Sequence, residues 1–227
     1  MQSINPKEIN CDTEDVEYVL LKIEKSYNIK FVSNEMATLK TFGEFSDHII
    51  SKINLEEKND CSSQQAFYKL KTAITKVTEI PEKEITPSAT LEELFPVKRR
   101  KIFYLIEKEL NLKLNAFAIP NRIFLGILVA LLISIVSIFF NWIYGVSSLV
   151  LTLLFLKIMH ETATEFSEDT IGGLVKKMMF ENYLQSRRNP NSYNKAEIKK
   201  NLEALFIEEL GLANEFTALA DDTIMIN

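Results

Sequence analysis

The chain has 227 residues, of which 47% are hydrophobic and 25% are charged, and its formal net charge at pH 7 is −5. This small negative charge gives no reason to expect a nucleic-acid partner. The two cysteines, Cys11 and Cys61, lie far apart without the spacing of metal ligands, so we expect free thiols. The first 15 residues are polar and lack the apolar core of a secretory signal, so no signal sequence is expected.

The first predicted unit covers residues 1–57 and contains two amphipathic helices. The first helix has apolar residues at helical spacing and closes with the motif IEKSYNIKF at residues 23–31. After a loop, Thr41 and Glu44 form a capping box, which predicts the start of the second helix. The apolar positions that these helices are expected to bury are Val16, Val19, Leu20, Ile23, Phe45, Ile49 and Ile53.

The second predicted unit covers residues 62–180. Ser62 and Gln65 form a further capping box ahead of a long amphipathic helix. A loop with two prolines follows, in which Thr90 caps one short helical turn. Another amphipathic helix then leads into the stretch IEKELNLKL.

The second unit repeats the first. IEKELNLKL, at residues 106–114, shares Ile, Glu, Lys, Asn and Lys with IEKSYNIKF at matching places. Further on, TIGGL at residues 170–174 corresponds to TFGEF at residues 41–45. An apolar segment separates the two matching parts of the second copy, which predicts that this segment is an insertion in the second repeat.

The apolar segment, residues 123–156, contains no charged side chain. It is broken between Asn141 and Gly145, where Trp142 and Tyr144 suit a membrane interface. Two helices of roughly 17–18 residues would result, each about 26 Å long, close to the hydrocarbon thickness of a bilayer. A buried hairpin in a soluble bundle is the alternative, but such a hairpin would carry a polar stripe. We therefore expect a transmembrane hairpin at residues 122–158.

The remaining segments set the topology and the fold class. Basic residues flank the hairpin on both sides and its turn is uncharged, so both polar arms are expected in the cytoplasm. Near the carboxyl end, RRNPNSYN is predicted to be a linker, and Asn194 with Glu197 to start the helix of a last segment, residues 190–227. Because no stretch shows strand alternation, the expected fold class is all-α, with small helical bundles and the hairpin.

This order of elements resembles the acyl carrier proteins. The resemblance is carried by the long first helix, the loop segment ITPSATLEEL, the middle helix and the last helix that begins TIGGL. It implies one four-helix carrier unit from residues 62–119 and 166–180, split by the hairpin. It also implies that residues 11–54 are the second half of another unit. Residues 194–227 would be the first part of a third unit, or would complete the amino-terminal one as a permuted copy.

The chain departs from the family at the attachment site of the prosthetic group. Acyl carrier proteins carry phosphopantetheine on the Ser of a D-S-L motif at the start of the middle helix. A gapless comparison places Thr13 there in the first repeat, and Phe95-Pro96-Val97, with no hydroxyl, in the second. A β-branched Thr is stiffer and more hindered than Ser. No cofactor is therefore expected, and Thr13 is expected to cap its helix.

The resemblance further implies that the middle helix is read by partner proteins, and in the family this helix is acidic. The first repeat keeps acidic residues there, although the helix dipole also favours them. The second repeat has a basic run instead, beside the hairpin, so anionic lipid headgroups are its expected partner, with the acidic helix of the first repeat as the alternative. The residues expected to make these contacts are Glu14, Asp15, Glu17, Lys98, Arg99, Arg100 and Lys101.

Signals for catalysis are weak. His48 is expected on the surface, and His160 lacks the second histidine of a zinc-protease helix. We therefore expect a non-enzymatic, membrane-anchored docking or scaffold protein that presents carrier-like units on the cytoplasmic face to proteins of lipid- or polyketide-type synthesis. Two alternatives remain. One is a functional acyl carrier modified at Thr13 or Ser3, and the other is a hairpin protein that shapes the membrane.

Overall fold

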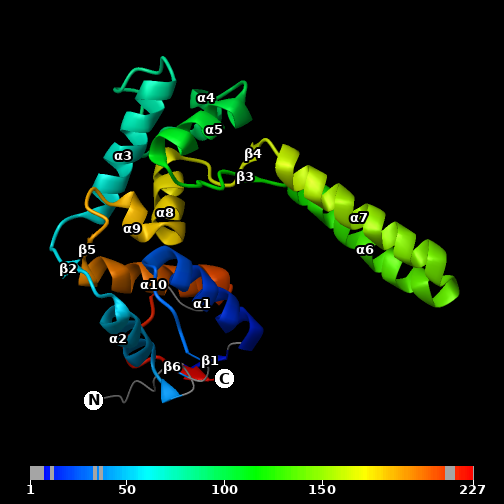
Figure 1. Cartoon of the computed structure of the whole chain (residues 1–227), viewed down its shortest axis with the longest axis horizontal. Coiled ribbons are helices and arrows are strands. Elements are labelled where there is room, and N and C mark those ends of the chain that lie inside the picture. The colour runs from blue at the N-terminus through cyan, green and yellow to red at the C-terminus, as the bar shows by residue number, and fades with distance from the viewer. Residues whose placement is uncertain (1–7, 11–12, 33–34, 36–37, 213–217, 227) are drawn as a thin grey trace.

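The structure is a computed structural model that describes residues 8–10, 13–32, 35, 38–212 and 218–226 (Figure 1). A body of short helices carries a long two-helix hairpin that projects to one side. The helices are α1 (Thr13–Tyr27), α2 (Phe42–Lys52), α3 (Ser62–Val77), α4 (Leu91–Leu94), α5 (Arg99–Leu110), α6 (Asn121–Phe140), α7 (Trp142–Thr162), α8 (Ile171–Glu181), α9 (Tyr183–Ser186) and α10 (Lys195–Glu209). The prediction of a mainly helical chain is confirmed.

Short strands join segments that are distant in the sequence. They are β1 (Glu8–Asn10), β2 (Glu56–Glu57), β3 (Phe117–Ala118), β4 (Glu165–Phe166), β5 (Ser192–Tyr193) and β6 (Ile224–Ile226). β1 pairs with β6 and β2 with β5, both in parallel, whereas β3 and β4 are antiparallel. The sequence did not indicate these strands, because two or three residues are too few to show a period-two pattern.

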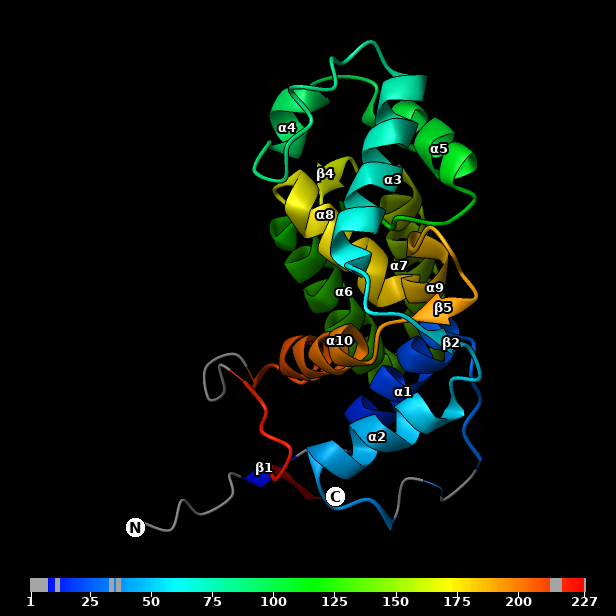
Figure 2. The same cartoon turned by 90° about the vertical axis from the view of Figure 1, so that its left-hand side faces the viewer.

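Two helical bundles make up the body (Figures 1 and 2). In the first bundle, α3 packs against α5 and α8. In the second bundle, α10 packs against α1 and α2, and the ring of Phe206 lies 5.8 Å from that of Phe42 and 4.8 Å from that of Phe45. The second bundle thus combines elements from the two opposite ends of the described chain.

The repeated nine-residue motif makes the same hydrogen bonds in both copies. The Glu24 carboxylate accepts a hydrogen bond from the Phe31 backbone N–H at 2.7 Å and another from the Lys30 side chain at 2.8 Å. The Glu107 carboxylate accepts one from the Leu114 N–H at 2.9 Å and another from the Lys113 side chain at 3.0 Å. The lysine hydrogen bond also holds the pKa of Glu24 below its usual value. In each copy the glutamate therefore fastens the following loop to the end of the helix.

The other shared residues of the motif have structural roles as well. Asn28 and Asn111 adopt φ angles of 52° and 54°, in the left-handed region that asparagine tolerates better than most residues. Ile23 and Ile106 are completely buried, each with 0% exposure. The shared lysine next to the glutamate lies in the last turn of α1 and of α5, where the helix dipole favours a cation. The repetition therefore reflects one local structure that is built twice.

The last helix of each copy, α2 or α8, also docks in the same way. The Gly43 N–H donates to the Asp221 carbonyl at 2.9 Å, and the Gly172 N–H donates to the Pro87 carbonyl at 2.8 Å. A Cβ atom on Gly43 or Gly172 would lie only 2.7 or 2.9 Å from that carbonyl oxygen. A threonine side chain caps each of these helices. The close approach of the loop requires glycine at both positions.

One predicted capping box is wrong. The N-cap residue of α3 is Cys61, which makes no side-chain cap, and Ser62 is already the first helical residue. The carboxylate of Glu197, in α10, accepts a hydrogen bond from the Ser62 N–H at 2.8 Å instead. This cap comes from a distant part of the chain, so local spacing could not indicate it. The predicted capping box at Thr41 and Glu44 is confirmed.

The hairpin differs from its predicted form at the turn and at its end. α7 continues to Thr162, beyond the predicted boundary at residue 158, and the turn is Asn141 alone. The Asn141 side chain accepts hydrogen bonds from backbone N–H groups in the first turn of α7, so the helix restarts at once. Gly145 lies inside α7 and not in the turn. A Cβ there would lie 2.4 Å from the backbone nitrogen of Ile138 in α6, so the close packing of the two helices requires glycine at this position.

Replacing Glu107 with Ala should destabilise the body. The N–H of Leu114, whose side chain is fully buried, would lose its acceptor, and an unsatisfied buried donor costs about 1–3 kcal/mol. Urea unfolding in mild detergent, followed by circular dichroism, measures the loss. Glu109→Ala is the matched control on the same helix, because the Glu109 side chain bonds to no described residue except Lys76, in a surface ion pair worth about 0–1 kcal/mol. Equal losses in the two variants would contradict the assigned role.

Candidate functional site

The root of the hairpin is where the chain leaves the body for α6 and returns from α7. The antiparallel pair β3 and β4 closes it, with the rings of Phe117 and Phe166 stacked at 5.3 Å. The ring of Phe103, from α5, lies 5.2 Å from Phe117 and 5.3 Å from Phe166. Phe95 packs on Phe103 at 5.1 Å, and both are almost fully buried. This aromatic cluster fastens the hairpin to α5.

Two residues of the predicted basic set hold the end of α7. Arg100 donates from Nε to the Ala163 carbonyl at 2.5 Å and from Nη2 to the His160 carbonyl at 2.7 Å. Arg99 donates from Nη1 to the Thr164 carbonyl at 3.3 Å. The last carbonyls of a helix lack intrahelical donors and carry the negative end of its dipole. Arg100 therefore supplies donors to the last turn and the C-cap of α7, and Arg99 holds the residue that follows the cap.

The same two arginines stack on the aromatic cluster. The guanidinium of Arg99 lies 4.9 Å from the centre of the Phe166 ring, and that of Arg100 lies 5.0 Å from the centre of the Phe117 ring. A guanidinium over a ring face gains further attraction. Both arginines thus have partners within the protein, which the interpretation of the whole basic run as a lipid contact did not include.

The two lysines of the basic set remain exposed. Lys98 and Lys101 make no side-chain hydrogen bond or ion pair with any other described residue. Together with the two arginines, Pro96 and Thr164, they line an open hollow of about 630 Å³ at the start of α5. No side chain in the described part of the chain caps this helix, and its first turn has no acidic residue. The helix dipole disfavours this concentration of positive charge.

The predicted acidic set lies on a different bundle. Asp15 and Glu17 are exposed on α1, whereas the side chain of Glu14 lies outside the described residues. Tyr18 and Leu21 are exposed beside them, by 54% and 63%. Figures 1 and 2 show α1 next to α10, at the end of the body away from α4 and α5. The acidic and basic sets are therefore not brought together within one molecule.

A buried arginine in the predicted linker was missed. Arg187 is 1% exposed and donates to the Tyr183 hydroxyl and to Ser192 Oγ, both at 3.2 Å. It also contacts the Ser62 hydroxyl and the Asp60 carboxylate. These groups come from the start of α3, from α9 and from β5. Arg187 Nη1 also lies 4.0 Å from the Glu197 carboxylate in α10, so the arginine connects the two bundles. Nothing in the local pattern RRNPNSYN distinguishes this arginine from a solvent-exposed one.

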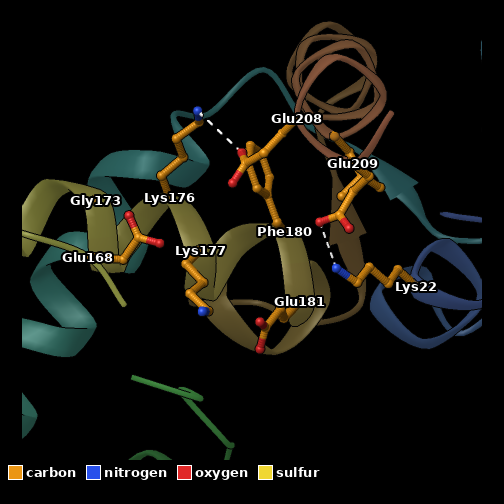
Figure 3. A pocket seen from close by; sticks show the side chains of 10 residues that line it. Lys22, Glu168, Gly173, Lys176, Lys177, Phe180, Glu181, Glu208 and Glu209 are labelled. Atoms are coloured by element: carbon orange, nitrogen blue, oxygen red, sulfur yellow. Dashed lines mark hydrogen bonds and ion pairs between the residues drawn. The ribbon is translucent and has the colours of Figure 1, made fainter. Parts of the chain in front are cut away.

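A small charged pocket lies between α1, α8 and α10 (Figure 3). Lys22 pairs with Glu209 at 2.6 Å, and Lys176 pairs with Glu208 at 3.8 Å across it. Burial raises the pKa of Glu168, which also lines the pocket. The volume is about 120 Å³. Pockets for small-molecule ligands are typically about 300–1,000 Å³. This pocket is therefore too small for such a ligand and is of a size for water. The ion pairs across it help to hold the two bundles together.

The residues considered for chemistry are placed as follows. His48 is half-buried, and its Nε2 lies 2.8 Å from the Glu35 carboxylate, which Lys52 also pairs at 2.7 Å. His160 is exposed at the root. Within the described residues, no group of three or more His, Cys, Asp or Glu side chains could hold a metal ion. Ser3, Cys11 and the side chain of Thr13 lie outside the described residues.

Glu35 should make the free energy of unfolding depend on pH in the acidic range. Hydrogen bonds from Lys52, from the Val32 N–H and from His48 lower its pKa from 4.5 to about 2. A lowered pKa means that the ionised carboxylate stabilises the fold fully above pH 4.5 and that this contribution is lost as the pH falls through about 2. Urea unfolding should therefore show Glu35→Gln less stable than wild type at neutral pH, with the gap narrowing below pH 4.5. A constant gap would contradict this assignment.

Comparison with protein-family models, with curated proteins and with solved structures found no match to this chain. The function proposed below therefore rests on the residues, contacts and charges of the chain itself.

Proposed function

We propose that this protein is a membrane-anchored docking or scaffold protein without enzymatic activity, with its body on the cytoplasmic face. The hairpin is the observation that carries the proposal. Only 11% of the most apolar stretch of α6 and 6% of that of α7 is buried within the protein. Soluble monomers rarely expose contiguous apolar patches larger than a few hundred Å². Lipid is the cover that fits two adjacent helices of this composition.

The dimensions of the hairpin support a span of the bilayer. α6 has 20 residues and α7 has 21. At about 1.5 Å per residue each helix is about 30 Å long, the thickness of the hydrocarbon region. Trp142 and Tyr144 are exposed at the tip, where amphipathic rings suit the far interface. Arg122 and Lys157 lie near the root and the tip is uncharged, which favours a cytoplasmic body.

The repeated contacts support a body built from two related units. One unit is residues 62–180, interrupted by the hairpin, and the other combines residues 1–57 with residues 190–227. The shared motif bonds and the equivalent glycine contacts of α2 and α8 give the two units one structural plan. In this proposal both units are related to acyl carrier proteins, and the second is a permuted copy.

The starts of the middle helices favour docking over acyl transfer. α1 begins at Thr13 and α5 begins at Arg99, so neither starts with the serine that carries phosphopantetheine in the family. What α1 offers is an exposed apolar pair, Tyr18 and Leu21, beside the carboxylates of Asp15 and Glu17. A partner with a basic rim around an apolar centre complements this face. A protein of lipid- or polyketide-type synthesis is the partner we propose.

Removing the hairpin should release the body from the membrane. Ala118 and Glu165 are paired in β3 and β4, so a two-residue Asn-Gly turn can join them directly. The full chain should stay with membranes in alkaline carbonate and be extracted only by detergent. The shortened chain should be soluble, with a helical circular dichroism spectrum. Release of the full chain by carbonate would refute the anchor.

The same preparation separates a full span from a wedge in one leaflet. A cysteine at Asn141, in a chain whose Cys11 and Cys61 are replaced by Ser, should react only with a reagent on the far side of sealed vesicles. Reaction only from the side of the body would instead support the membrane-shaping alternative.

Neutralising the acidic face should weaken partner capture. Asp15→Asn with Glu17→Gln should reduce the recovered partner several-fold in a pulldown in mild detergent, because charge complementarity is lost. Glu79→Gln with Glu82→Gln is the control, since both residues are exposed in the loop after α3. Unchanged recovery would refute docking through α1. A mass gain after coexpression with a phosphopantetheinyl transferase would support the carrier alternative instead.

A further inference from the structure

We infer that the hollow at the start of α5 binds the phosphate of an anionic phospholipid. This inference rests on the proposed membrane anchor and adds a specific lipid site to it. Of the six residues that line the hollow, four are cations and none is acidic. They are Pro96, Lys98, Arg99, Arg100, Lys101 and Thr164. Such a lining selects for a small anion with several oxygen acceptors.

The two arginines are held in place and keep donors to spare. Arg99 uses Nε for the Phe95 carbonyl and Nη1 for Glu92 and Thr164, so its Nη2 bonds to no described residue. Arg100 uses Nε and Nη2, so its Nη1 bonds to none either. A guanidinium has five N–H donors in a fixed plane. These groups are therefore oriented before a phosphate arrives, which lowers the entropic cost of binding.

The two lysines add charge that the protein does not neutralise. Neither Lys98 nor Lys101 has an ion-pair partner among the described residues, and both are exposed around the hollow. Four cations close together repel one another and sit at the unfavourable end of the α5 dipole. A bound phosphate offsets both effects.

The position of the hollow identifies the phosphate as that of a lipid. The uncharged part of α7 ends before Lys157, and His160 lies three residues later, about 4.5 Å further along the helix axis. The headgroup layer extends about 5–8 Å beyond the hydrocarbon on each side of a bilayer. Arg100, which is bonded to the His160 and Ala163 carbonyls, therefore lies at headgroup depth if the hairpin spans the membrane.

The hairpin also offers a place for an acyl chain. An open groove of about 440 Å³ runs between α6 and α7 in the half nearer the root, lined by apolar residues such as Gly126, Ala130 and Phe155 and by one polar residue, Thr152. A Cβ atom on Gly126 would contact nothing within 4 Å, so the protein leaves this space open. An anionic head and an apolar tail each have a matching surface at the same end of the hairpin.

Native mass spectrometry of the full chain tests the site. The protein in mild detergent is mixed with phosphatidylglycerol and phosphatidylcholine of identical acyl chains, and bound lipids are counted. Wild type should prefer phosphatidylglycerol, and Lys98→Gln with Lys101→Gln should weaken that preference roughly 30-fold. Lys25→Gln with Lys108→Gln, at exposed positions in the last turns of α1 and α5, removes equal charge and should leave it unchanged.

Three results would overturn the inference. The first is a phosphatidylglycerol preference that survives in the Lys98 and Lys101 variant. The second is an equal loss in the control variant, which would mean that total charge alone matters. The third is full displacement of the lipid by excess inorganic phosphate, which would identify a site for a free anion. If the Lys98 and Lys101 variant loses the phosphatidylglycerol preference but still resists carbonate extraction, the lipid site is supported. If carbonate releases the wild-type chain, the membrane anchor itself is refuted.

Discussion

Closure of the hairpin root is the contact on which the rest of the structure depends. α5 and α8 belong to one bundle around α3, yet the whole hairpin lies between them in the chain. The β3 and β4 pair, the stacked rings of Phe117 and Phe166, and the bonds of Arg99 and Arg100 bring the two ends together. A long insertion is tolerated when its ends meet, since loop closure costs little more as length grows. The polar body and the apolar hairpin can therefore have different surroundings, as the proposed membrane anchor requires.

The two copies of the repeat differ where function is expected and agree where the backbone needs a partner. Glu24 and Glu107 are kept because each satisfies a backbone N–H in the loop that follows. The charges at the starts of α1 and α5 have opposite signs, and the exposed side chains there are free of that constraint. The acidic copy presents Tyr18 and Leu21 to solvent, while the basic copy holds the hairpin. The two copies therefore share the same backbone contacts but carry side chains of opposite charge at the starts of α1 and α5.

Polar contacts join the two bundles. The Tyr183 backbone N–H donates to the Ser26 hydroxyl at 2.9 Å, and the ring of Tyr183 lies 5.2 Å from that of Tyr27. Arg187 adds a buried charge with several hydrogen-bond partners. A buried ion pair contributes little net stability, but losing one partner is costly, so such a network favours one relative orientation of the bundles. A fixed orientation suits the proposed function, in which the body faces both a membrane and a partner.

The sequence by itself determined the helices other than the short α9, the hairpin and the internal repeat, because each depends on local periodicity or on a continuous apolar run. It also located the capping box at Thr41 and Glu44, whose two partners are three residues apart. The tertiary structure alone decided the cap of α3 by Glu197, the buried position of Arg187, and the bonds of Arg100 to the end of α7 and of Arg99 to Thr164 just beyond it. In each of these cases the partner is distant in sequence. From the sequence alone a charged side chain is predicted to be solvent-exposed. Only the fold shows which carbonyl, hydroxyl or ring lies beside it.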